Sequence, residues 1–320
     1  MKRLFCLLLV LSLLLAGCGK EAAAPEPTEL PTTAATEAPT EAPTEAPTEP
    51  ATEAPPEPEP TEAPLPMVNP LTGEPLDAYY TGRPVAFSLN NIAACLPQYG
   101  LNDLDWMFEV ETEGGVTRCV GLIADPSGVG KLGPVRSARS YFVNLSVSYD
   151  APLFHCGASQ FVRNNWYAYD KTLSQWDHVD QTVRGSEYFY RDSRGGGYAQ
   201  EHTLFTSGDR LAKAMEELSL NPTGNEPFTY GYQFSDTVSL EGQPADTVKI
   251  TFMGSKSTSM RYDAEAGVYQ ARQYGSDWID GTTKENLAFR NVLVIHAEQS
   301  KHQGPQYVHS FYDLDGTGDG

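Results

Sequence analysis

A long segment of low complexity separates the start of this chain from the part that can fold. Residues 19–66 consist almost entirely of Pro, Glu, Thr and Ala, with the unit TEAP recurring, for example at residues 40–43. Such a composition offers too little apolar surface to offset the entropy lost on ordering, and proline with mutually repelling glutamates keeps a chain extended. Because the repeat has no hydrophobic face, we expect a disordered, extended linker and no stacked-repeat fold.

The residues before this linker have the pattern of a secretion signal. A basic start at residues 2–3 precedes an apolar run at residues 4–15, which is too short to span a membrane. The run ends in LAGC, a bacterial lipobox. We therefore expect residues 1–17 to be a lipoprotein signal peptide and Cys18 to carry the acyl chains (palmitate-type) of a membrane anchor on the extracytoplasmic face. The alternative is an ordinary secretion signal with a chance cysteine.

The charge of the chain limits its partners. The whole chain carries a net charge of −20, of which −8 belongs to residues 1–66 and −12 to residues 67–320. An acidic body repels nucleic acid and anionic membrane surfaces, so the membrane is expected to be a partner only through the lipid anchor. A local basic pocket remains compatible with this balance.

Little in the sequence predicts metal or cofactor chemistry. Cys95, Cys119 and Cys156 remain besides Cys18 and the signal-peptide cysteine, and three cysteines allow at most one disulfide. Their spacing matches no zinc site, so we expect small buried hydrophobic side chains. No metal and no cofactor are expected.

The first part of the folding region is expected to mix strands and helices. Apolar patterning and turn residues predict strands at 84–90, 106–112, 116–124 and 151–157 and helices at 134–149 and 207–219. The turn at 113–115 is expected to join the second and third strands as a hairpin, and Ser207 to cap the second helix.

The second part is expected to be mostly β. Short β-type runs follow a turn at 221–224; they are residues 246–253, 258–263, 267–274, 291–298 and 306–313. We therefore predict an α+β (mixed α/β) chain: a mixed sheet-and-helix domain at 67–223, then a smaller, mostly β domain at 224–320.

The glycines of GVGKLG, residues 128–133, resemble a dinucleotide-binding fingerprint, but their context argues against one. A fingerprint needs a strand that runs directly into the glycines and a helix that contains the third glycine. Here residues 125–127 intervene after the strand, and Pro134 directly follows the third glycine. Lys131 is followed by Leu132, whereas a phosphate loop needs Ser or Thr there. A nucleotide is therefore not expected.

Two arginines at the start of the predicted 134–149 helix need a compensating charge. Arg136 and Arg139 are three residues apart, on one helical face, where the helix dipole opposes them by a few tenths of a kcal/mol each. Arg118, Glu109 and Glu113 lie on the strands and turn nearby. Two interpretations stay open: an internal Arg–Glu lattice, or an anion pocket lined by the same groups and by free backbone N–H groups.

Several motifs resemble the YerB-like bacterial lipoprotein family, whose domains have no known function. The resemblance covers about residues 67–320 and is most specific in EGGVTR at 113–118 and GPVRSAR at 133–139. It implies a two-domain extracytoplasmic lipoprotein of the cell envelope and no particular reaction. It also implies that the family's second domain continues beyond Gly320, so the domain at 224–320 is expected to be C-terminally truncated.

The chain departs from the family pattern at two places. Asn90 stands where the family usually has Asp, and residues 201–203 read Glu-His-Thr where the family often has Pro-His-Asn. If the family's Asp served as a catalytic acid or metal ligand, Asn90 would weaken that role in this chain.

These observations favour a binding protein over an enzyme, and no catalytic residue is assigned. We expect Arg118, Arg136 and Arg139 to clamp an anionic small molecule or cell-wall fragment. The residues expected to orient it or to line the rim are Glu109, Glu113, Asn90, His155 and His202. His155 also fits a core histidine of an apolar strand. The alternatives are a wall-directed hydrolase that uses Glu and His as acid and base, and a structural envelope assembly factor.

Overall fold

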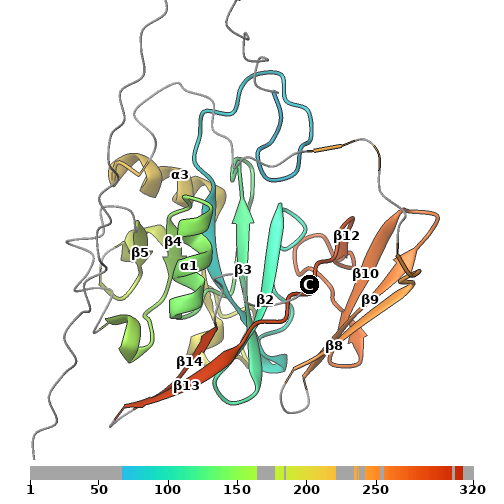
Figure 1. Cartoon of the computed structure of the whole chain (residues 1–320). Helices are drawn as coiled ribbons and strands as arrows, with labels where there is room; N and C mark the ends of the chain where they lie inside the picture. The colour runs from blue at the N-terminus through green and yellow to red at the C-terminus, as the bar shows by residue number, and fades with distance from the viewer. Residues whose placement is uncertain are drawn as a thin grey trace, which may run out of the picture. The chain divides into compact units, whose positions relative to one another are not determined.

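The computed structural model describes part of the chain, and all architecture below refers to that part (Figure 1). It covers residues 67–163, 177–183, 185–220, 234–235, 237, 242–252, 256–304 and 307–312. The predicted signal peptide, the lipidated Cys18 and the linker at 18–66 lie outside these residues. So do most of the residues around the predicted domain boundary at 223.

A five-stranded mixed sheet forms the centre of the first part, in the order β2-β3-β1-β4-β5. Its strands are β1 (Val85–Asn91), β2 (Trp106–Thr112), β3 (Val116–Ile123), β4 (Leu153–His155) and β5 (His178–Asp180). The pairs β2–β3 and β3–β1 are antiparallel, whereas β1–β4 and β4–β5 are parallel. The predicted hairpin is confirmed: Gly114 and Gly115 take left-handed backbone conformations in the β2–β3 turn, which favour glycine.

The two faces of this sheet are covered by different helices. On one face, Ala86, Val120 and Leu122 pack with the buried residues of α1 (Ser140–Ser148), such as Phe142. On the other face, Phe87 belongs to a core cluster that includes the apolar stripe of α3 (Gly208–Glu217), with Leu211, Ala214 and Met215. Ser207 is the N-cap of α3, but its side chain makes no capping hydrogen bond.

The predicted helix at 134–149 is correct only in its second half. Residues 134–138 are extended and bond to the sheet, so α1 begins at Ser140 with Arg139 as its N-cap. The amide of Arg136 donates to the carbonyl of Ser88 in β1, and its carbonyl accepts from the amide of Cys156 just after β4. Backbone groups that bond to neighbouring strands cannot form a helical ladder. Arg136 and Arg139 therefore do not share a helical face.

The second part contains an antiparallel sheet in the order β11-β10-β9-β8, with β12 paired to β10. Its strands are β8 (Thr247–Thr251), β9 (Ser257–Asp263), β10 (Val268–Gln273), β11 (Ser276–Asp277) and β12 (Ala288–Phe289). A separate antiparallel pair is formed by β13 (Gln299–Gly304) and β14 (Tyr307–Tyr312). The fold class, a mixed sheet with helices followed by a smaller, mostly antiparallel domain, is confirmed.

The strand predicted at 291–298 is wrong. These residues belong to no strand of a sheet, apart from a single bridge at His296, and the next strand begins at Gln299. Val292 and Val294 are partly buried, whereas Leu293 and Ile295 are exposed. Alternating apolar residues favour a β-strand. Whether the strand forms depends on a neighbouring strand with which it can pair, and the local sequence does not reveal that neighbour.

The shorter elements lie in the connections. They are η1 (Ala93–Cys95), η2 (Ser186–Tyr188), β6 (Tyr190–Arg191), η3 (Gln200–His202) and β7 (Leu204–Phe205). Three of them position the site described below, because η3 places Glu201 and His202 and lies in the connection between the paired strands β6 and β7.

Candidate anion-binding site

The pleat of the first sheet divides the predicted site residues between its two faces. Asn90 of β1 pairs in register with Arg118 of β3, so both side chains lie on the face that α1 covers. Glu109 of β2 pairs with Cys119, one position along β3, and therefore lies on the opposite face. A single pocket lined by all eight predicted residues does not form.

Glu109 is held by an internal polar network. Its Oε1 accepts from Asn91 Nδ2 at 2.9 Å and from Thr117 Oγ1 at 2.6 Å, and lies 3.2 Å from Lys256 Nζ. Its Oε2 accepts from Thr258 Oγ1 at 2.7 Å. Lys256 and Thr258 belong to the second sheet region and are almost fully buried. Glu109 thus ties the two sheets together and does not orient a ligand among the arginines.

Glu113 and Arg139 form a fixed ion pair at the hairpin turn. Arg139 Nε donates to Glu113 Oε1 at 3.0 Å and to Oε2 at 2.8 Å, and its Nη2 lies 2.8 Å from Oε2. Burial alone would raise the pKa of Glu113, but the hydrogen bonds and charge of Arg139 outweigh it and lower the pKa. The carboxylate therefore stays ionised, and this pair confirms one element of the predicted Arg–Glu lattice.

Arg118 differs from Arg139 because no carboxylate of the described residues lies within ion-pair distance of it. Its hydrogen bond from Nη1 goes to the carbonyl of Ser137 at 2.7 Å. Burial, followed by the charges of Arg139 and Arg136, lowers its pKa to about 9. The guanidinium therefore remains charged at neutral pH; the charge of Glu113, which Arg139 binds directly, and the Ser137 carbonyl stabilise it.

The start of α1 adds further donors beside these arginines. Within the described residues, the Ser140 hydroxyl is buried, at 3% exposure, and has no hydrogen-bond partner. Arg136 Nε is likewise buried without a partner. The N-cap, Arg139, gives the helix no side-chain capping bond. The first turn of a helix presents backbone N–H groups and the positive end of the helix dipole, which together bind anions.

Arg136 faces the turn of η3 through loose contacts. Its Nη1 lies 3.5 Å from the carbonyl oxygen of Glu201 and 3.6 Å from the carboxylate Oε2, and the Glu201 side chain is 53% exposed. The three arginines and the two glutamates beside them, Glu113 and Glu201, leave one positive charge in excess. Arg136 and Arg139 lie on the extended backbone before α1 and at its N-cap, and Arg118 of β3 bonds to Ser137 between them, so the three charges act on one another without sharing a helical face.

Asn90 and His202 contact each other at the edge of this arginine group. Asn90 Nδ2 lies 2.8 Å from His202 Nδ1, and His202 Nε2 lies 3.5 Å from Glu201 Oε1. An amide nitrogen donates, so Nδ1 accepts and the neutral ring carries its hydrogen on Nε2, facing Glu201. Burial, Arg136 and Arg194 lower the pKa of His202 against the opposing effect of Glu201. Asn90, where the chain departs from the family pattern, is thus in direct contact with the histidine of the other departing segment, residues 201–203.

His155 lies in the core, as an apolar strand predicts, and makes no contact with the arginines that would place it at a rim. Its Nδ1 donates to the Gly157 carbonyl at 2.7 Å, so its Nε2 accepts from His178 Nδ1 at 3.0 Å. The two rings stack with centroids 5.2 Å apart. Burial lowers the pKa of His155, which is fully buried and neutral.

The buried His155 is expected to make stability depend on pH. With its folded pKa below 6.5, the unfolded chain binds more protons than the folded one below pH 6.5. The contribution of His155 to the free energy of unfolding is therefore fully present above about pH 6.5. It is lost as the pH falls, with a slope of up to about 1.4 kcal/mol per pH unit. Urea unfolding between about pH 6.5 and 5 measures the slope. His155→Phe should flatten it and the exposed His296→Gln should not; an unchanged slope in His155→Phe would contradict the assignment.

Ser140 and Glu201 were not predicted from the sequence as neighbours of the arginines at the start of α1. Ser140 directly follows Arg139, and a correct helix start would have identified it as the first helical residue. Glu201 lies 65 residues from Arg136 along the chain, and nothing in the local pattern signals their contact. The free thiols of Cys95 and Cys119 are buried, which agrees with their predicted structural role.

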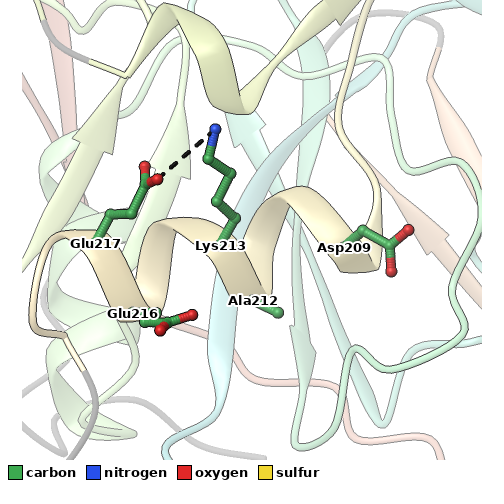
Figure 2. A pocket seen from close by; sticks show the side chains of 5 residues that line it. All are labelled: Asp209, Ala212, Lys213, Glu216 and Glu217. Carbon is green, nitrogen blue, oxygen red and sulfur yellow. Dashed lines mark ion pairs between the residues drawn. The ribbon is translucent and has the colours of Figure 1, made fainter.

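Two surface depressions lie away from the arginines. One follows the exposed side of α3, where Lys213 and Glu217 form an ion pair at 3.8 Å and Asp209 and Glu216 point to solvent (Figure 2). The other lies over β9 and β10 and is lined by Arg261, Gln270 and Arg272 among others. Both are open polar surfaces. The second is lined by Asn286, whose buried Oδ1 has no hydrogen-bond partner among the described residues, but an unpartnered acceptor does not favour an anion, so neither competes with the start of α1 as an anion site.

Comparison with known families matches two consecutive models of one family. Residues 71–221 match the N-terminal domain, and residues 248–320 the C-terminal domain, of a family described as protein of unknown function (DUF3048). Together they span more than half of the chain. The chain belongs to this family.

Two relatives support the assignment, and both are YerB. The chain is 28% identical over 259 residues to "Putative lipoprotein YerB" of Bacillus subtilis, covering 78% of this chain and 70% of the relative. The crystal structure of YerB protein from the same organism matches with a TM-score of 0.61 at 26% identity, over 77% of this chain and 80% of that one. The predicted resemblance to YerB-like proteins is confirmed, and the chain is homologous to a lipoprotein of unknown function.

Two further observations concern membranes and metals. No helix in the described ranges combines the length and the apolar composition needed to cross a membrane. Within those same ranges, no group of three or more His, Cys, Asp or Glu side chains is arranged to hold a metal ion.

Proposed function

We propose that this protein is a lipid-anchored lipoprotein on the extracytoplasmic face of the cell membrane. Its folded part would bind an anionic envelope ligand at Arg118, Arg136, Arg139 and the start of α1. The lipobox at Cys18, with the apolar run before it, supports the anchor, and the name of the relative agrees with it. The extended linker would hold the folded part away from the membrane surface.

The observation that carries the proposal is the charge of Arg118. Removing a guanidinium from water costs several kcal/mol unless a counter-charge or several hydrogen bonds compensate. Glu113 forms its ion pair with Arg139, whereas Arg118 has one backbone carbonyl in contact, two arginines nearby and only the more distant charge of Glu113 to offset them. An oxyanion bound beside Arg118 would supply the counter-charge.

The neighbouring donors fit the same ligand chemistry. An oxyanion has several acceptor oxygens and forms short, strong bonds with guanidinium groups and backbone N–H groups. Ser140 Oγ and Arg136 Nε, which lie at the start of α1 and just before it in the chain, are buried polar atoms without partners among the described residues, and buried polar groups normally have partners. One anion would satisfy these donors together.

The hydrolase alternative has no comparable support. A glycosidase needs one carboxyl group with a raised pKa as its acid. Glu109 is enclosed by four internal partners, and the pKa of Glu113 is lowered. No single observation favours the assembly-factor alternative either.

Titration of the full-length chain with methyl phosphate tests the proposal. Arg136→Ala is expected to weaken binding about tenfold, because a hydrogen bond from a charged group is worth about 1.5–3 kcal/mol. Arg261→Ala is the matched control, since it removes an equal charge from the exposed surface of β9. Wild type that does not bind, or equal weakening in both variants, would contradict the proposal.

A further inference from the structure

Glu201 contacts the arginine group in a different way from Glu113. Glu113 binds Arg139 through three contacts of 2.8–3.0 Å, and the Glu113 side chain is 24% exposed. Glu201 reaches Arg136 at 3.6 Å, and its side chain is 53% exposed. Exposed ion pairs at such distances contribute little to stability, about 0–1 kcal/mol. Glu201 is therefore poorly explained as a structural partner.

The position of Glu201 is nevertheless set by its neighbours. Its backbone carbonyl also lies 3.5 Å from Arg136 Nη1, and His202, the next residue, is 4% exposed and holds Asn90. His202 Nε2, which carries the ring hydrogen, lies 3.5 Å from Glu201 Oε1. The carboxylate is thus kept beside Arg136 while remaining open to solvent.

A fixed negative charge changes the field that a bound anion meets. With Glu113 and Glu201 ionised, the three arginines leave one positive charge, and without Glu201 they leave two. Coulomb repulsion scales with the product of the charges, so a carboxylate repels a dianion twice as strongly as a monoanion at the same place. Its effect on the logarithm of affinity is therefore twice as large for the dianion.

From this geometry we infer that Glu201 is a specificity-determining residue. It lowers the affinity of the site for doubly charged oxyanions, such as phosphomonoesters, more than for singly charged ones, such as phosphodiesters. The inference rests on the function proposed above and adds the charge class of the ligand.

The test compares Glu201→Gln with wild type, using methyl phosphate and dimethyl phosphate as probes for the full-length chain. At about pH 8 the first probe is a dianion, because the second pKa of a phosphomonoester is about 6. Glu201→Gln is expected to tighten methyl phosphate binding about tenfold and dimethyl phosphate binding about threefold. Calorimetry measures both dissociation constants.

Glu216→Gln is the matched control, because Glu216 is an exposed carboxylate on α3 (Figure 2), and α3 packs on the face of the sheet opposite to α1. It should leave both affinities unchanged. If wild type binds the probes and Glu201→Gln behaves as Glu216→Gln, or changes both probes equally, the inference is wrong while the proposed function stands. If neither wild type nor Glu201→Gln binds either probe, both are wrong.

Discussion

Replacing Glu109 with glutamine is expected to lower the free energy of unfolding by about 3–5 kcal/mol. The substitution keeps the shape of the side chain but removes the counter-charge of Lys256, which is 2% exposed. The remaining contacts of Lys256 Nζ are to neutral oxygens, at 3.0 Å from Thr258 and 2.6 Å from Gln273, and to the faces of Tyr274 and Trp278. A buried ammonium group that has lost its carboxylate destabilises the folded state, and this lowers the free energy of unfolding.

Urea unfolding measures this effect, with Glu216→Gln as the exposed control, for which a change below about 0.5 kcal/mol is expected. The double variant Glu109→Leu/Lys256→Met should recover part of the loss, because removing both charges leaves neither one unpaired. A loss below about 1 kcal/mol for Glu109→Gln would show that the network does not hold the two sheets together.

Replacing Arg118 with methionine is expected to have opposite effects on stability and on binding. Anion affinity should fall at least about tenfold, because the central guanidinium is lost. The free energy of unfolding should stay the same or rise by about 1 kcal/mol, because a half-buried guanidinium with no carboxylate of the described residues within ion-pair distance is removed. The Ser137 carbonyl, which loses its bond from Arg118, still accepts from Ser88 Oγ at 3.3 Å.

Arg83 supplies the matched control for this variant. Its side chain is 10% exposed and pairs with Asp150 at 2.7 Å and with Asp177 at 2.5 Å. Arg83→Met should therefore destabilise the fold, by about 2 kcal/mol or more, without affecting anion binding. If Arg118→Met destabilises the protein as much as Arg83→Met, Arg118 is a structural residue and the binding proposal loses its main support.

The sequence predicted four of the five strands of the first sheet, because their signals are local, and missed β5. In β2, Trp106, Phe108 and Val110 pack against one core cluster, as the period of two predicted, and Gly114-Gly115 forms the turn that follows. Alternation also placed Glu109 and Glu111 on one face. Alternation does not show which face of the sheet α1 covers. Glu109 was therefore predicted to lie beside the arginines, although it lies on the opposite face.

The start of α1 was mispredicted because two structures compete for the same residues. Val135 and Ala138 repeat at helical spacing, but both are also buried by the extended chain that bonds to β1 and β4. Backbone hydrogen bonds to β1 and to the residue after β4 hold this segment in an extended conformation, so the helix begins only at Ser140. Contacts such as Arg136–Glu201 and His155–His178 depend on strand order and loop paths, which a single sequence does not contain.

A crystal of the full-length chain soaked in selenate would locate a bound oxyanion directly, through the anomalous signal of selenium. Our account predicts a peak within hydrogen-bonding distance of the Arg118 guanidinium and Ser140 Oγ, and its absence in Arg118→Met crystals. Selenate peaks found only on exposed side chains such as Lys213 would contradict it, as would a peak that persists in Arg118→Met. Either result would show that the arginines at the start of α1 serve only the fold.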